Sequence, residues 1–323
     1  MADIDVNLEK IHDERLKRFR ILVCVDGSEE SYRGLNYASE CGARRDADII
    51  LLYVRPIDQG LRTGGLQVRV ARENMLKWGL ELPGIQYLKK GLEFLKDSGN
   101  LGDDWDEKTT HTEIKGDPLG DNKTEYKNKD GKVIVLKLKT ASTVAAGILD
   151  QYELGPYNMI IMGTSGRWGG WTKAFWDPAV AEKVASHAPC SVLITRDLER
   201  GKGYLMCTDG SEHSREMIVK AGEFSLRTDS QVSVMSVALD VESEDEARNN
   251  VDEAIVALAK IGIEPKETFV RVGNPIEEIV DAGSEYSIIA VGDTGKTGLK
   301  RFFMGSVSFR VLEQANNSVM VVR

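Results

Sequence analysis

The stretch that decides the fold is YLMCTDGSEHS at residues 204–214, because a near copy, ILVCVDGSEES, stands at residues 21–31. Each is a short apolar run that leads into Asp-Gly-Ser-Glu, and Asp209 stands at the position equivalent to Asp26. Self-similarity of this kind within a chain indicates copies of one structural unit. The sequence therefore predicts a tandem duplication in which each copy begins with the same strand and turn.

Two further pairs of stretches repeat in the same order. MIIMGTSG at 159–166 matches IIAVGDTG at 288–295, and each ends in Gly-x-x-Gly. AVAEKVASHAPCSVLITR at 179–196 matches SVSFRVLEQANNSVMVVR at 306–323, with nearly the same separation between the copies. Matched landmarks in one order support the duplication along most of the chain.

The halves differ in length before the Gly-x-x-Gly turn. The stretch from Val54 to Gly163 in the first half is much longer than the equivalent stretch from Val237 to Gly292 in the second, so the first half holds about 54 extra residues. We place them within 60–135, whose later part is polar and rich in Asp, Lys, Gly and Thr. A buried loop would leave backbone polar groups unpaired, so this part is predicted to be a surface hairpin or loop.

We predict two α/β domains, at 1–197 with an N-terminal helix and at 203–323, joined by a linker at 197–203. Apolar runs and helical patterns alternate in each half, which is typical of an open, doubly wound sheet. In the second half the predicted strands are 204–208, 232–238, 268–272, 287–291 and 319–322, and the predicted helices are 213–226, 244–261, 275–283 and 306–315. Each domain is thus expected to be an open, mostly parallel five-stranded sheet with flanking helices, with any ligand beyond the carboxyl ends of the strands.

Composition narrows the class of protein. Of 323 residues, 41% are hydrophobic and 29% are charged, which is an ordinary globular balance. A formal net charge of −9 argues against nucleic acid as the main partner. No run approaches the roughly 18 apolar residues of a membrane span, and the charged N-terminus lacks a signal core. Four cysteines without a CxxC pair favour free thiols, so a cytoplasmic location is expected.

A glycine-rich loop follows the fourth predicted strand of the second half. Gly292 and Gly295 are separated by two residues, and Gly305-Ser306 follows after nine more residues, at the start of a predicted helix. Glycine allows close approach of the backbone to a ligand. A helix N-terminus offers free N–H groups and a favourable dipole to an anion. The spacing therefore predicts a phosphate-binding loop.

This pattern resembles the nucleotide loop of the universal stress protein family, and the strand-Asp-x-Ser start and the VMVVR ending are similar to that family as well. The chain is identified as a tandem member. The resemblance implies Rossmann-like (adenine nucleotide alpha hydrolase-like) domains, ATP binding in some members, and a nucleotide-dependent role in stress response or regulation. Mg²⁺ or Mn²⁺ is implied only as a companion of the triphosphate, and no catalytic or independent metal residues are predicted.

The resemblance also implies roles for particular residues of the second half. Asp209 is expected on the ribose and adenine side, and the backbone of Val237 on adenine. Val291, Gly292 and Gly295 are expected along the ribose and phosphates. Three successive residues are expected to hold the phosphate end of the nucleotide: Gly305, Ser306 and Val307.

The first half departs from the pattern. Gly163 and Gly166 are present, but the later Gly-Ser is replaced by Trp176-Asp177 or by Pro178-Ala179, depending on the alignment. Proline has no N–H to donate, and a carboxylate repels phosphate. Trp168, Trp171 and Trp176 crowd this loop, either as an aromatic ligand platform or as fillers of a vacated site or an interdomain contact. We predict one nucleotide site per chain.

Three alternatives stay open. Residues 290–297 match a relaxed Walker A pattern, although Gly298 interrupts the helix that such a loop needs. A slow ATP hydrolase or an adenylyl-transfer enzyme of a related fold is the second, and Asp293 and Lys296 are the nearby charged residues. A nucleotide-free interaction protein is the third.

The last strand of each half predicts how the halves assemble. Residues 191–196 and 318–323 are apolar and would be a pairing hazard if left bare. We therefore expect them to pair within one chain as an intramolecular pseudo-dimer. The surfaces that remain leave room for a further homodimer.

Overall fold

The computed structural model describes residues 13–57, 83–114, 117–151, 156–164, 178–196, 201–293 and 304–323. The predicted N-terminal helix falls largely on residues 1–12 and the linker on 197–200, outside this part. The strands of the first half are β1 (Phe19–Cys24), β2 (Ala47–Pro56), β3 (Asp106–Ile114), β4 (Asp117–Lys127), β5 (Val133–Ala141), β6 (Met159–Gly163) and β7 (Ser191–Thr195). Its helices are α2 (Glu29–Cys41), α4 (Pro83–Asp97), α5 (Val144–Leu149) and α6 (Pro178–His187).

The second half follows the predicted order of elements closely. Its strands are β8 (Tyr204–Cys207), β9 (Val232–Ala238), β10 (Glu267–Val272), β11 (Ile288–Gly292) and β12 (Ser318–Val322). Its helices are α7 (Glu212–Arg227), η3 (Val241–Ser243), α8 (Glu244–Ala259), α9 (Pro275–Gly283) and α10 (Ser306–Gln314). Ser211 and Asn274 begin α7 and α9 by accepting hydrogen bonds from backbone N–H groups with their side chains.

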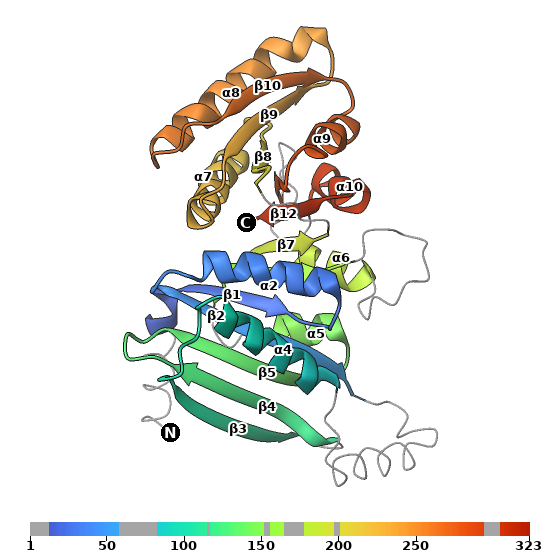
Figure 1. Cartoon of the computed structure of the whole chain (residues 1–323). Helices are drawn as coiled ribbons and strands as arrows, with labels where there is room; N and C mark the ends of the chain where they lie inside the picture. The colour runs from blue at the N-terminus through green and yellow to red at the C-terminus, as the bar shows by residue number, and fades with distance from the viewer. Residues whose placement is uncertain are drawn as a thin grey trace, which may run out of the picture.

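Within the described residues, all twelve strands form one sheet in the order β10-β9-β8-β11-β12-β7-β6-β1-β2-β5-β4-β3. The second half contributes five parallel strands, and five strands of the first half, β5-β2-β1-β6-β7, repeat this parallel arrangement. Helices cover both faces of the sheet (Figure 1). The α/β fold with parallel sheets and flanking helices is thus confirmed.

The extra residues of the first half enlarge its sheet to seven strands, two more than the prediction. The polar segment forms the hairpin β3–β4, which pairs antiparallel with β5 at the end of the sheet (Figure 1). Polar contacts between strands stabilise the hairpin and its pairing with β5. The hydroxyls of Thr109 and Thr124 lie 3.1 Å apart, and the ammonium of Lys139 lies 2.7 Å from the carboxylate of Asp121. The hairpin was expected, but its incorporation was not, because low apolar content gave no sign of sheet pairing.

The two halves meet where β7 and β12 pair antiparallel, with Leu193 opposite Met320. We call this pairing and the helix contacts on its two faces the seam. On one face Tyr37 of α2 hydrogen-bonds Tyr204 of β8, and both side chains are buried. The apolar cores above and below the sheet are continuous across the seam, because each contains buried residues of both halves.

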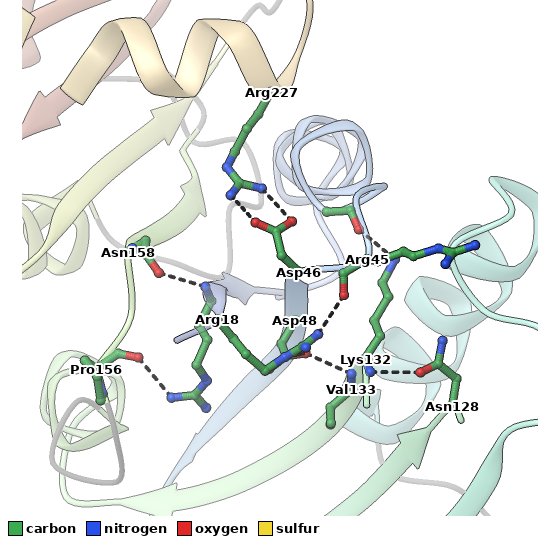
Figure 2. Close-up of polar contacts among 12 residues, drawn as sticks. Arg18, Arg45, Asp46, Asp48, Asn128, Lys132, Val133, Pro156, Asn158 and Arg227 are labelled. Carbon is green, nitrogen blue, oxygen red and sulfur yellow. Dashed lines mark hydrogen bonds and ion pairs between the residues drawn. The ribbon is translucent and has the colours of Figure 1, made fainter. Parts of the chain in front are cut away.

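An ion pair crosses the same face of the seam. The guanidinium of Arg227, at the end of α7, donates to both carboxylate oxygens of Asp46, at 2.7 and 3.3 Å (Figure 2). It also stacks 3.7 Å from the ring centre of Phe19. Nearby, Asp48 accepts from Arg18 at 2.7 Å and from the N–H of Val133 at 2.9 Å, which fixes the start of β2 against β5 (Figure 2).

Candidate functional site

A pocket of about 440 Å³ lies at the carboxyl end of the second-half sheet. Its floor is formed by the ends of β8, β9 and β11, and its walls by the N-terminal parts of α8, α9 and α10. β8 and β11 are adjacent although not consecutive in sequence, so the strand order reverses here. A reversal point of this kind is the usual place for a ligand in an open α/β sheet.

The pocket brings together nearly all of the residues that the sequence singled out. The lining includes Asp209, Val237, Val291, Gly292, Gly305, Ser306 and Val307. Gly295 lies outside the described residues. Residues far apart in the sequence therefore converge on one cavity, which is the arrangement that a ligand site requires.

Asp209 stands at a rigid turn after β8. Its carboxylate accepts the N–H of Ser211 at 3.0 Å, and its own N–H donates to the hydroxyl of Ser214 at 3.2 Å. Gly210 has φ of +74°, and a Cβ there would lie 1.9 Å from the side-chain oxygen of Asn250. Glycine is thus required both by the backbone conformation and by the close approach of α8.

The N-terminus of α10 forms another part of the pocket wall. Gly305 precedes the helix without a side-chain cap, and its N–H donates to the carbonyl of Asp293. The first N–H groups of a helix have no partner within the helix, and the dipole there favours negative charge. Because Ser306 and Val307 line the cavity, this end can hold an anion. Gly305 has φ of −59°, so the backbone conformation alone does not require glycine here.

Sequence analysis missed the wall formed by α8 and the residue before it. Ser243, Glu246, Ala247 and Asn250 line the pocket at three- and four-residue spacing. This helical periodicity was the available signal. Asp209 and Glu246 are carboxylates, and no Lys or Arg occurs among the lining residues that the structure describes. The pocket therefore has carboxylates that suit hydroxyl and amino donors, and at α10 it has a helix N-terminus that can hold an anion.

Burial determines the chemistry of Cys207 at the floor of the pocket. Loss of solvent raises the pKa of this thiol to about 12, so it stays protonated at neutral pH. A protonated thiol is a poor nucleophile. Cys207 is thus a half-buried, unreactive residue that lines the cavity. In the described part of the chain, no group of three or more His, Cys, Asp or Glu residues could hold a metal ion.

The corresponding turn of the first half is closed. Asp26 is 2% exposed, and its carboxylate accepts both the N–H and the hydroxyl of Ser28. A Cβ on Gly27 would lie 2.5 Å from the ring of Tyr87, which takes the place that Asn250 has in the second half. The loop with Trp168, Trp171 and Trp176 and with Gly166 lies outside the described residues, so their roles stay predictions.

Comparison with known proteins identifies the family. The family model described as "Universal stress protein family" matches residues 17–77, 92–196 and 204–323, which is most of the chain. The chain belongs to the universal stress protein family. The matched segments fall on the two halves, so both copies are universal stress protein sequences.

Two curated universal stress proteins of Methanocaldococcus jannaschii are similar to parts of the chain. MJ0577 is 37% identical over 81 residues, which are 24% of this chain and 49% of that protein. MJ0531 is 31% identical over 139 residues, which are 38% of this chain and 82% of that protein. The chain thus spans about half of the first relative and most of the second.

Several solved structures are similar over nearly the full length of the chain. A universal stress protein from Archaeoglobus fulgidus DSM 4304 has a TM-score of 0.59 at 17% identity, covering 94% of this chain and 98% of its own. At this identity the likeness shows the fold alone.

None of the helices in the described ranges is long and apolar enough to span a membrane.

Proposed function

We propose that this universal stress protein binds ATP in its second half and acts as a nucleotide-dependent stress-response or regulatory protein. The observation that carries the proposal is the convergence of Asp209, Val237, Gly292 and the Gly305 end of α10 on one cavity. A cavity of about 440 Å³ lies within the range of small-molecule sites.

The groups that line the cavity match the parts of a nucleotide. Asp209 lines the cavity, where its carboxylate can accept hydrogen bonds from ribose hydroxyls. Val237, at the end of β9, can present its backbone to adenine beside the exposed side chain of Leu239. The N–H groups at the start of α10 can hold phosphate oxygens. Mg²⁺ or Mn²⁺ would come with the triphosphate, which supplies oxygen ligands of the kind these ions prefer.

Calorimetric titration with ATP tests the proposal, with matched variants at equivalent turns. Asp209→Asn should weaken ATP binding about tenfold, because about 1.4 kcal/mol of charge-assisted hydrogen bonding is lost. Asp26→Asn should leave binding unchanged, because that carboxylate is buried and already bonded to Ser28. One site per chain is expected. Two sites, or equal losses from the two variants, would contradict the proposal.

A glycine variant tests the phosphate end. Gly305→Asp should abolish ATP binding, because the side chain occupies the approach to α10 and its carboxylate repels phosphate, while a φ of −59° adds no backbone strain. Gly163 belongs to the equivalent glycine turn of the first half, but Gly163→Asp cannot serve as a neutral control. A Cβ there would lie 2.4 Å from the backbone nitrogen of Ser31, so the variant would disturb packing of β6 against α2.

Incubation of the same protein preparation with labelled ATP distinguishes a binding protein from an enzyme. Retention of intact labelled ATP supports a binding protein, whereas rapid turnover supports the hydrolase or adenylyl-transfer alternative. Asp293, one charged residue considered near the phosphates, lies 3.3 Å from the guanidinium of Arg323. This ion pair already engages the carboxylate of Asp293, which disfavours its use as a general base.

A further inference from the structure

Two arginines cross the seam in a reciprocal way. Arg196, which follows β7, donates to the carbonyls of Leu312 and Ala315 at the end of α10, the latter at 2.7 Å. Arg323, which follows β12, donates to the carbonyl of Ala185 in α6 and to that of Cys190 just beyond it. Each arginine thus binds the C-terminal end of the last helix in the other half.

The two arginines differ in their charge partners. Arg323 has the carboxylate of Asp293 at 3.3 Å. Arg196 is 6% exposed and has no carboxylate partner among the described residues, and its Nε has no hydrogen-bond partner. Burial lowers the pKa of Arg196 to about 10. A buried cation without an acid is costly, so the negative end of the α10 dipole is its main compensation.

Helix α10 connects this cation to the pocket. The carbonyls that bind Arg196 belong to Leu312, in the last turn of the helix, and to Ala315, just after it. The N-terminal residues Ser306 and Val307 line the cavity. Nine helical residues span only about 13 Å and move as one rod. The position of the N-terminus therefore depends on how the C-terminus is held.

We propose that Arg196, a residue of the first half, is a positioning residue for the ligand site of the second half and acts through α10. The proposal rests on the proposed function. Arg196 fixes the position of the C-terminal end of α10 and stabilises the helix dipole. It thereby holds the N-terminal N–H groups where they can bind phosphate. This explains how a half whose own turn is closed contributes to a nucleotide site.

A positioning role predicts a loss that depends on the phosphates. Arg196→Met should weaken ATP binding about fivefold or more, the lower end of typical coupling between sites. Adenosine should bind equally well to the variant and the unaltered chain, because it has no phosphate to reach α10. Arg196→Lys should recover part of the ATP affinity, since an ammonium can donate to the same carbonyls.

The test titrates ATP and adenosine into the full chain and its variants by calorimetry. The control is Asp46→Asn, which removes a seam ion pair on the other face that does not touch α10, and it should leave both affinities unchanged. If Arg196→Met does not fold, Arg196→Lys must still show a lower ratio of ATP to adenosine affinity than the unaltered chain. Equal weakening of both ligands, or no change in the ATP affinity, overturns the positioning role but leaves the proposed function intact. Failure of the unaltered chain to bind ATP overturns the proposed function, and the positioning role with it.

Discussion

The seam offers a direct test of how the two halves are joined. We propose that residues 1–197 and 203–323 are two domains held as an intramolecular pseudo-dimer by the pairing of β7 with β12. Leu193 and Met320 are directly opposite in this pairing, and both side chains are fully buried. Truncation of each side chain to alanine should reveal whether the two residues depend on each other.

The expected magnitudes follow from burial and contact. Leu193→Ala and Met320→Ala should each lower the free energy of unfolding by about 3 kcal/mol, as is usual for large buried aliphatic side chains. Because cross-strand neighbours interact, the double variant should lose about 0.5–1 kcal/mol less than the sum of the two. Urea unfolding followed by circular dichroism measures all four proteins.

A distant pair provides the control. Leu51 is also fully buried, but β2 lies four strands from β12, which is about 19 Å at the usual strand spacing. Leu51→Ala and Met320→Ala should therefore be additive. Additivity of the Leu193 and Met320 variants to within about 0.3 kcal/mol would refute the pairing of the strands across the seam.

Two further predictions concern an ion pair and a glycine. The hydrogen bond from Arg227 lowers the pKa of Asp46, so this contribution to stability is present above the unfolded pKa of about 4 and is lost as the pH falls through the lower folded value. The difference in urea midpoint between the unaltered chain and Asp46→Asn should shrink from about pH 5 to about pH 3, and a constant difference would count against the ion pair. Gly210→Ala should destabilise the protein more than Gly262→Ala does. The two glycines have similar backbone strain to offer, with φ of +74° and +78°, but only a Cβ at Gly210 would meet a neighbour, the side chain of Asn250. Equal unfolding midpoints would show that Asn250 does not pack on Gly210.

The second half could be predicted almost completely from its sequence. Most of its strands are apolar, and its helices have clear boundaries. The Asn274-Pro275 start of α9, for example, matches the predicted range of 275–283. The pocket floor was also predictable, since a strand end followed by Asp or Gly marks the carboxyl edge of a parallel sheet. The α8 wall was harder to predict, because residues at three- and four-residue spacing also line an ordinary solvent-exposed helix face.

The first half was harder to predict for a physical reason. The hairpin β3–β4 adds to the sheet mainly through backbone pairing and polar side chains, so hydrophobic periodicity does not show it. The closure of its turn was also hidden, because Tyr87 is far from Gly27 in the sequence. Only the folded chain brings that ring onto the glycine.

The comparison of equivalent residues separates what holds the halves together from what forms the site. Arg196 and Arg323 occupy equivalent positions and make equivalent contacts across the seam. Their neighbours differ: Asp293 pairs with Arg323, whereas Thr164 stands at the equivalent position of the first half. The two-fold-related contacts of the seam use both arginines. A single nucleotide site, in contrast, requires an open pocket in only one of the two halves. The first half can therefore have a closed turn without loss of the seam, while its arginine still supports the helix that borders the pocket of the second half.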